Sequence, residues 1–264
     1  MKVKLLILSL VMFNVLPAQH TITQFAPIVA YLEHSDTSDR GVIIINCGTG
    51  FFVTDSSETF IYLVTASHVA TFMDNTSSIT YLIGKDSSRT VKLYDLAGNN
   101  FKWTHHDEAD VAALKLKHLE YIYKEFENHC FPITNIEKSL MAPERDTPIT
   151  ILGFPLRLGY KDKFSPISIV VNPASGLTRL PRFDNGIETI LFMIDRPTIG
   201  GYSGAPIFQL PSAHSNSNFI MSIEAGGQPK IVGIVHGTMS DVTGGKLGAL
   251  TPSRYIIETI NKIK

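Results

Sequence analysis

Cysteine is scarce in this chain, with only Cys47 and Cys130 among 264 residues. A disulfide between them is permitted if the protein is exported, but two thiols so far apart are weak evidence for one. The alternative is that both are small buried side chains. No cysteine or carboxylate spacing completes a zinc site around His105 and His106, which fit a solvated turn, so we expect neither a metal nor a cofactor.

Basic clusters and long apolar runs are also missing. The net charge is −1 and no block of lysine or arginine occurs, so there is no reason to expect a nucleic-acid partner. No later stretch reads as a membrane helix. A hydrophobic content of 44% and a charged content of 18% suit an ordinary globular protein, and the length allows one large or two small cores.

Residues 1–19 have the pattern of a secretory signal peptide. Two lysines precede a short apolar run at residues 5–16, and Ala18 is a small residue suited to cleavage. The run is too short to span a bilayer comfortably. The alternative is a buried helix or strand. We therefore expect residues 20–264 to form a secreted or periplasmic protein without a membrane span.

Short β-strands dominate the rest of the sequence. Segments rich in valine, isoleucine, tyrosine and phenylalanine are bounded by polar or glycine-containing turns. A first group of strands is predicted at Pro27–Leu32, Gly41–Cys47, Gly50–Thr54, Phe60–Thr65, Ile79–Ile83, Thr90–Tyr94 and Val111–Leu116. A second group is predicted at Pro148–Leu152, Ile167–Val171, Thr189–Ile194, Ala205–Gln209, Phe219–Ile223 and Ile231–Val235. A short helix is predicted at His118–Phe126, and residues 128–145 suit a linker.

The last residues predict an amphipathic helix at residues 252–263. Thr251 is a candidate N-cap, Pro252 fits the first helical position, and four isoleucines form one apolar face. Two groups of short strands and little helix indicate two packed β-barrels, at about residues 26–125 and 146–250.

The stretch GGYSGAPIF at residues 200–208 raises the question of whether Ser203 is a turn residue or a nucleophile. Glycine and serine cluster in turns for steric reasons, so the stretch alone decides nothing. A nucleophilic serine needs a base, a group that orients the base, and donors for an oxyanion. His68 follows a predicted strand. Asp110 lies in EADVAALKL, where polar residues lead directly into a predicted apolar strand. A buried carboxylate there needs a partner, and a histidine would be one.

Four segments together resemble the trypsin-like (chymotrypsin-fold) serine peptidases, most of all the exported bacterial type without a PDZ domain. They are GTGFFVT…LVTASHVA, ADVAALKL, ILGFPLRLG and IDRPTIGGYSGAPIF…IVGIVHG, in the order and spacing of that family. The resemblance covers about residues 41–255. It implies an all-β fold of two packed six-stranded antiparallel β-barrels with a C-terminal helix. It also implies an exported serine endopeptidase that hydrolyses polypeptide substrates through an acyl-enzyme.

The resemblance implies a role for each catalytic residue. Ser203 Oγ is expected to attack the scissile carbonyl, and His68 to take its proton and pass it to the leaving amine. Asp110 is expected to hold His68 and stabilise the imidazolium. The N–H groups of Gly201 and Ser203 are expected to form the oxyanion hole, where a donor is worth about 3 kcal/mol in comparable sites.

Two positions depart from the digestive members of this family. Tyr202 stands where an aspartate pairs with a new N-terminus after propeptide cleavage, so activation by N-terminal insertion is not expected. Pro197 stands at the base of the specificity pocket, where cleavage after lysine or arginine relies on an aspartate. That specificity is therefore disfavoured.

The resemblance places Thr198, Gly237, Thr238 and Gly248 in the same pocket, while His236 has several interpretations. Glutamate-specific relatives have a pocket histidine after a similar strand, but this sequence is one residue longer there. One residue of slip turns a strand side chain to the other face. His236 would then face Asp110, where the family often has a serine. A purely structural histidine is the third interpretation.

Two further functions remain open at this point. The same fold could act as a protein-binding or chaperone-like module whose hydrolytic activity is weak or lost. Quality-control relatives usually carry a C-terminal PDZ domain, and we expect no room for one after the terminal helix. A hydrolase of esters alone would use the same acyl-transfer site. The sequence carries no indication of oligomeric state.

Overall fold

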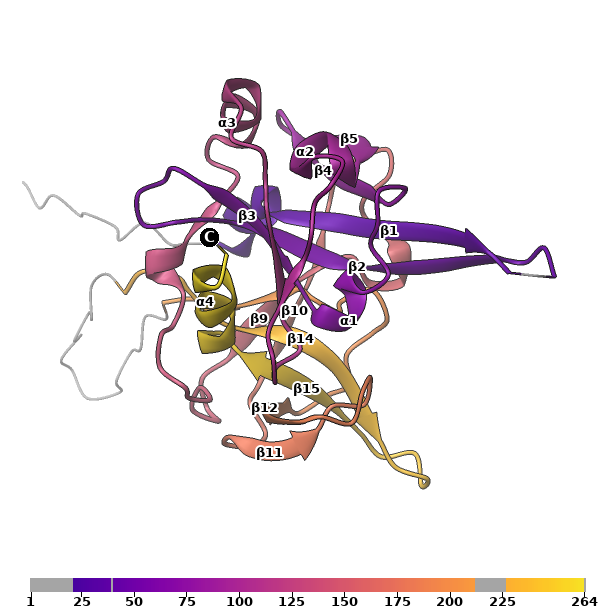
Figure 1. Ribbon diagram of the computed structural model, residues 1–264. Helices are drawn as coiled ribbons and strands as arrows, with labels where there is room; N and C mark the ends of the chain where they lie inside the picture. The colour runs from indigo at the N-terminus through magenta and orange to yellow at the C-terminus, as the bar shows by residue number, and fades with distance from the viewer. Residues whose placement is uncertain (1–20, 39, 212–226, 264) are drawn as a thin grey trace, which may run out of the picture.

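The computed structural model describes residues 21–38, 40–211 and 227–263, and its strands form two sheets (Figure 1). The first sheet contains β1 (Val29–Thr37), β2 (Ile43–Thr54), β3 (Ile61–Thr65), β4 (Ser78–Ile83), β5 (Ser87–Lys92), β6 (Thr104–His105), β7 (Ala112–Lys115) and β8 (Phe131–Pro132). The second sheet contains β9 (Ile149–Gly153), β10 (Ile167–Val171), β11 (Thr178–Pro181), β12 (Glu188–Ile194), β13 (Pro206–Gln209), β14 (Lys230–Ser240) and β15 (Lys246–Pro252). Short helical segments connect them: η1 (Ile22–Ile28), α1 (Ser67–Ala70), α2 (Leu93–Ala97), α3 (Glu120–Phe126), η2 (Ile133–Asn135), η3 (Pro155–Arg157) and the terminal α4 (Arg254–Asn261).

Six antiparallel strands make up most of each sheet. The strand order is β5-β4-β1-β2-β3-β7-β6 in the first sheet and β10-β9-β13-β14-β15-β12-β11 in the second. The strands beyond these six are short. In the first sheet they are β6 and β8, with two residues each, and in the second sheet the extra strand is β11, which pairs with β12. Within the described residues the end strands of each path do not pair with each other, so the two sheets are barrel-like but not closed barrels. The predicted all-β class, two antiparallel units with a C-terminal helix, is confirmed.

Alternate residues of the first sheet pack in opposite directions, as the strand period requires. Phe52 of β2 lies in the core of the first barrel with Leu63 of β3. Its neighbour Phe51 belongs to a second cluster, which contains Phe208 of β13 and Ile256 of α4. This second cluster joins the two sheets, and the functional site described below lies along the same junction.

Several local predictions need correction. The two strands predicted around Gly48 and Gly50 are one continuous strand, β2, because these glycines do not turn the chain. They allow close contact instead, since a Cβ at Gly48 would lie 2.7 Å from the Val69 side chain. The predicted N-cap Thr251 is wrong: Thr251 and Pro252 end β15, and Ser253 is the N-cap of α4. β15 and β11 were not predicted.

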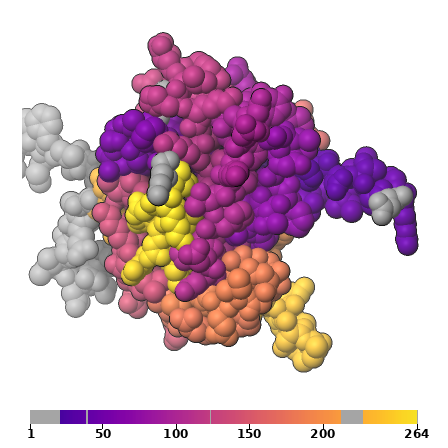
Figure 2. All heavy atoms as spheres, in the orientation of Figure 1, coloured from indigo at the N-terminus to yellow at the C-terminus, as the bar shows by residue number. Residues whose placement is uncertain are grey.

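Some predictions fall outside the described residues, namely the signal peptide at residues 1–19 and the strand at Phe219–Ile223. Within the described ranges, no helix is long and apolar enough to cross a membrane. Cys47 and Cys130 are both free, so the disulfide is not formed. Figure 2 shows two hairpins, β1–β2 and β14–β15, projecting from the body of the molecule.

Candidate active site

His68 is the second residue of α1, directly after the buried strand β3. Its side chain is 23% exposed, so one edge of the ring faces solvent. Its Nδ1 donates to Asp110 Oδ2 at 2.7 Å, and its backbone N–H donates to Asp110 Oδ1 at 2.9 Å. These two bonds fix both the ring and the backbone of His68 against one carboxylate, leaving Nε2 as the basic nitrogen.

Asp110 is fully buried in the loop between β6 and β7. The imidazole of His106 organises this loop, because its Nδ1 accepts the N–H groups of Glu108 at 3.1 Å and Ala109 at 3.0 Å. Its Nε2 then donates to Glu258 of α4 at 3.1 Å. The terminal helix therefore braces the loop that carries Asp110.

Two further side chains bond the Asp110 carboxylate. His236 Nδ1 lies 2.5 Å from Oδ2, and Arg182 Nη2 lies 3.1 Å from Oδ1. Burial by itself raises the pKa of this carboxyl, but the hydrogen bonds from His236 and His68 outweigh burial and hold the pKa well below its usual value. Asp110 is therefore ionised at neutral pH.

His236 of β14 faces Asp110 and not the pocket side of its strand. The pairing of β14 with β15 shifts register between Val235 and Gly237, so His236 sits at an irregularity in the ladder. The ring is fully buried and stacks on Phe183, with 3.8 Å between ring centroids. Nδ1 donates to the carboxylate, and the buried Nε2 has no hydrogen-bond partner within the described residues.

Ser203 lies on a turn that packs directly against the segment leading to His68. Its carbonyl oxygen accepts the N–H of Thr49 at 2.9 Å. The next residue, Gly204, has φ +84°, and a Cβ there would lie 2.3 Å from Thr49 O and 2.8 Å from Ala66 N. Only glycine fits this approach, which brings Ser203 beside α1. The described part of the chain contains no hydrogen bond between Ser203 Oγ and His68; such bonds often tighten only when substrate binds.

The residues before Ser203 form a type II turn. Tyr202 N–H donates to Ile199 O at 3.0 Å, and Gly201, the third residue of this turn, has φ +101°. The N–H groups of Gly201 and Ser203 have no acceptor among the described residues. They are two unpaired backbone donors in the turn that carries Ser203, and an oxyanion site requires such donors.

Tyr202 is buried beneath this turn. Its hydroxyl donates to Ile167 O on β10 at 3.2 Å, and burial raises its pKa to about 12. The ring belongs to the core of the second sheet. Packing and one hydrogen bond thus hold the turn where the digestive relatives use a charged pair.

The predicted pocket residues are partly brought together. Thr198 and Thr238 share a hydroxyl–hydroxyl bond of 2.9 Å, and Thr238 Oγ1 also donates to Thr198 O at 2.8 Å. Gly248 is paired with Thr238 across the β14–β15 ladder. Pro197 is exposed, and Gly237 lies against the ring of Phe183. His236 is not part of this group.

Sequence reasoning missed two residues of the site, Thr49 and Arg182. Thr49 Oγ1 donates to Gly201 O at 2.8 Å and accepts the N–H of Phe154 at 3.1 Å. Arg182 reaches Asp110 from the turn after β11. Thr49 lies 152 and 105 residues from its two partners, and Arg182 lies 72 residues from Asp110. Thr49 stands inside the segment GTGFFVT that resembles the family, but nothing in that segment indicates that its hydroxyl bonds Gly201; no motif surrounds Arg182.

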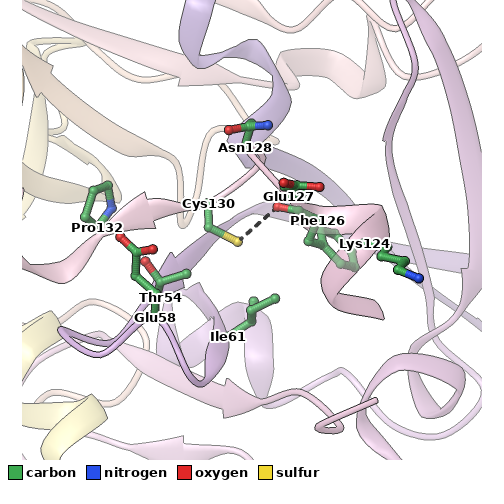
Figure 3. A pocket seen from close by; sticks show the side chains of 9 residues that line it. All are labelled: Thr54, Glu58, Ile61, Lys124, Phe126, Glu127, Asn128, Cys130 and Pro132. Atoms are coloured by element: carbon green, nitrogen blue, oxygen red, sulfur yellow. Dashed lines mark hydrogen bonds between the residues drawn. The ribbon is translucent and has the colours of Figure 1, made fainter. Parts of the chain in front are cut away.

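A cavity of about 530 Å³ elsewhere on the protein is not part of this site (Figure 3). Cys130 lies in its wall, where the thiol contacts Phe126 O at 3.8 Å. Burial raises the pKa of this thiol to about 12, so it is no nucleophile at neutral pH.

The ligand atoms of His68, Asp110 and His236 lie within 4.8 Å of one another, a grouping that could also hold a metal ion. Here the two nitrogens bond the carboxylate directly, at 2.7 and 2.5 Å, and the cationic Arg182 shares it. In this arrangement the carboxylate oxygens already accept hydrogen bonds from three side chains.

Comparisons with known proteins agree with this geometry. The family model described as a trypsin-like peptidase domain matches residues 48–212, more than half of the chain. Similar solved structures include Deg5, with 15% identity over 92% of this chain and 91% of that one and a TM-score of 0.53. They also include a scabies mite inactivated protease paralogue (13% identity, 94% and 97% covered, TM-score 0.54) and human heparin binding protein (11%, 94% and 95%, TM-score 0.51). These likenesses show the fold.

A search of curated proteins finds no match. The family model alone matches more than half of the chain, and the matched residues include His68, Asp110 and Ser203. The chain therefore belongs to the family of trypsin-like peptidase domains.

Proposed function

We propose that the protein is a serine endopeptidase that cleaves polypeptides through an acyl-enzyme on Ser203. The observation that carries this proposal is the buried Asp110 carboxylate bonded to His68 Nδ1, with the Ser203 turn and its two unpaired N–H groups beside α1. A peptidase of this kind needs a base, an orienting group and oxyanion donors, and the described residues supply candidates for each.

In this mechanism His68 Nε2 accepts the proton of Ser203 Oγ as the oxygen attacks the scissile carbonyl. Asp110 stabilises the imidazolium, and the N–H groups of Gly201 and Ser203 receive the developing oxyanion. His68 then protonates the leaving amine. Water repeats the sequence on the ester and releases the second product.

The decisive experiment is labelling with a fluorophosphonate, which reacts only with an activated serine. We expect the protein to be labelled at Ser203 and to hydrolyse unfolded polypeptides. Ser203→Ala should abolish labelling and reduce turnover by several orders of magnitude, with an unchanged melting temperature. Unchanged peptidase activity in pure Ser203→Ala protein would refute the assignment.

A binding module is the second candidate. One structural neighbour is named an inactivated protease paralogue and another a heparin binding protein, so this fold serves other functions in other proteins. Absence of labelling together with saturable binding of an uncleaved polypeptide would favour this function over hydrolysis.

We also propose that the protein is exported, because residues 1–19 have the pattern of a signal peptide. N-terminal sequencing of protein recovered from the periplasm or the medium should begin near His20. Recovery of the intact Met1 terminus from the cytoplasm alone would contradict export.

A further inference from the structure

Arg182 is a buried cation in contact with the candidate catalytic group. Its side chain is 3% exposed and lies at the start of the turn between β11 and β12. Nη2 donates to Asp110 Oδ1 at 3.1 Å, and Nη1 donates to Ala109 O at 3.1 Å. Nε and Nη2 also hold both oxygens of Asp184, at 2.9 and 2.6 Å. The guanidinium therefore bridges a carboxylate on its own turn and the loop of Asp110.

Backbone hydrogen bonds within its own turn hold Arg182 next to Asp110. Arg182 N–H donates to Ile187 O at 2.9 Å, and Gly186 N–H donates to Arg182 O at 2.7 Å. Phe183, the next residue, stacks on the ring of His236. One short turn thus contacts both Asp110 and the second histidine bonded to Asp110.

The charges in this group are unevenly shared. Asp110 and Asp184 each carry −1 and Arg182 carries +1, so the three together have a net charge of −1 beside His68. Arginine stays protonated at any pH at which the protein is folded. Removing the charge of Arg182 would leave −2, whereas removing that of Asp184 would leave zero.

Other titratable groups face the same region. His236 from β14 bonds Asp110 on the side opposite Arg182. His105 from β6 shares a bond of 2.7 Å with Ser67, the residue before His68, and burial and the charge of Arg182 lower its pKa. Burial and Arg182 therefore both disfavour a positive charge on His105. The charges that a substitution can change in this group are those of Arg182 and Asp184.

We propose that Arg182 is a positioning residue that anchors the Asp110 carboxylate and, by sharing its charge, sets the proton affinity of His68. The proposal rests on the proposed function in that His68 is taken as the catalytic base. Arg182 acts through Asp110 and need not touch substrate. A guanidinium suits this role because its planar fork holds two carboxylates and a backbone carbonyl at once.

The test uses two substitutions with opposite expected signs. Arg182→Met removes a positive charge, so protonated His68 becomes more favourable and its pKa should rise by about one unit. Asp184→Asn removes a negative charge, so the pKa of His68 should fall, by about half a unit because Asp184 is partly exposed. Arg179→Met, on the exposed part of β11, is the matched control and should shift nothing.

Two measurements report the shift. In the plot of kcat/KM against pH, the midpoint of the acid limb should move to higher pH in Arg182→Met and to lower pH in Asp184→Asn. NMR titration of the His68 imidazole in the Ser203→Ala background should show the same shifts without any turnover. Arg182→Lys keeps the positive charge but loses the planar guanidinium. The midpoint of its acid limb should therefore stay within about 0.3 pH unit of the wild type, while its plateau kcat/KM falls by about tenfold.

The outcomes separate this proposal from the proposed function. If the NMR shifts have the expected signs but no variant or wild-type protein hydrolyses peptides, the peptidase function fails and the positioning role stands. If Arg182→Met is folded and His68 titrates as in the wild type, Arg182 merely holds its turn and the proposal is wrong. Should Arg182→Met not fold, a shift in Asp184→Asn that is absent or upward overturns the proposal by itself.

Discussion

The hydroxyl of Thr49 on β2 donates a hydrogen bond of 2.8 Å to the carbonyl oxygen of Gly201, across the junction of the two sheets. The same hydroxyl accepts the N–H of Phe154 at 3.1 Å. One buried side chain of the first sheet therefore fixes two loops of the second, including the turn expected to bind the oxyanion.

Thr49→Val tests this link, because valine has nearly the same shape but no hydroxyl. It leaves Gly201 O and Phe154 N–H buried and unpaired, at a cost of about 1–3 kcal/mol in the free energy of unfolding. We expect kcat to fall with little change in KM, measured alongside urea denaturation. Thr49→Ser restores the hydroxyl and should recover most of both losses; equal defects in the two variants would contradict the interpretation.

Gly201 should not tolerate a side chain. Its φ is +101°, and a Cβ would lie 2.3 Å from Phe154 O, so Gly201→Ala must move the backbone that carries the oxyanion donor. Losing one such donor costs about 10² to 10³ in kcat in comparable sites. Steady-state kinetics together with a melting curve test this. Retention of activity within threefold would show that the Gly201 N–H is not used.

Asp110→Asn should keep the geometry but favour the wrong tautomer of His68. In another enzyme with the same kind of triad, the corresponding substitution lowers turnover by about 10⁴, and we expect a similar loss here near neutral pH. Kinetics at pH 7 provide the measurement, with Asp107→Asn on the exposed part of the same loop as the control. A loss smaller than tenfold in Asp110→Asn would point to a different orienting group.

Tyr202 predicts that the protein is active without a second cleavage. The turn is held by the buried ring and its bond to Ile167 O, so a free N-terminus has no charged partner to insert against. Chains that begin near His20, and chains with a few additional residues there, should hydrolyse a peptide panel at rates within about threefold of each other, less than the 1.4 kcal/mol of a tenfold change. Activity confined to one exact N-terminus would revive the insertion mechanism.

Part of the free energy of unfolding should depend on pH through Glu137. The hydrogen bond from Lys230, at 2.7 Å, and the Ser139 N–H lower its pKa from 4.5 to about 2. A carboxylate whose pKa is lower in the folded state stabilises the protein above its unfolded pKa, and this stabilisation is lost as pH falls through the folded value. Glu137→Gln should therefore be less stable than the wild type above about pH 4.5, with the difference vanishing near pH 2, in denaturation followed across pH. A difference that persists unchanged at pH 2 would contradict this assignment.

Local patterns were enough to predict most strands and the residues of the site that lie on motifs. Strands such as Ile167–Val171 are rich in β-branched residues and lie between turns, and such segments can be predicted from the local sequence. Ser203, His68 and Asp110 each lie in a short stretch that resembles the family. β15, by contrast, begins with lysine and contains a glycine, and only its pairing with β12 and β14 makes it a strand.

The sequence by itself determined the fold class and the identity of the candidate nucleophile, base and carboxylate, because these depend on strand periodicity and on contiguous motifs. The sequence left three interpretations of His236 open, and only the tertiary structure decided that it faces Asp110, since the direction of a strand side chain depends on the register of the strand pairing. The tertiary structure alone also decided that Arg182 and Thr49 belong to the site. Their partners are 72 and 152 residues away along the chain, and contacts over such separations exist only once the two sheets have packed together.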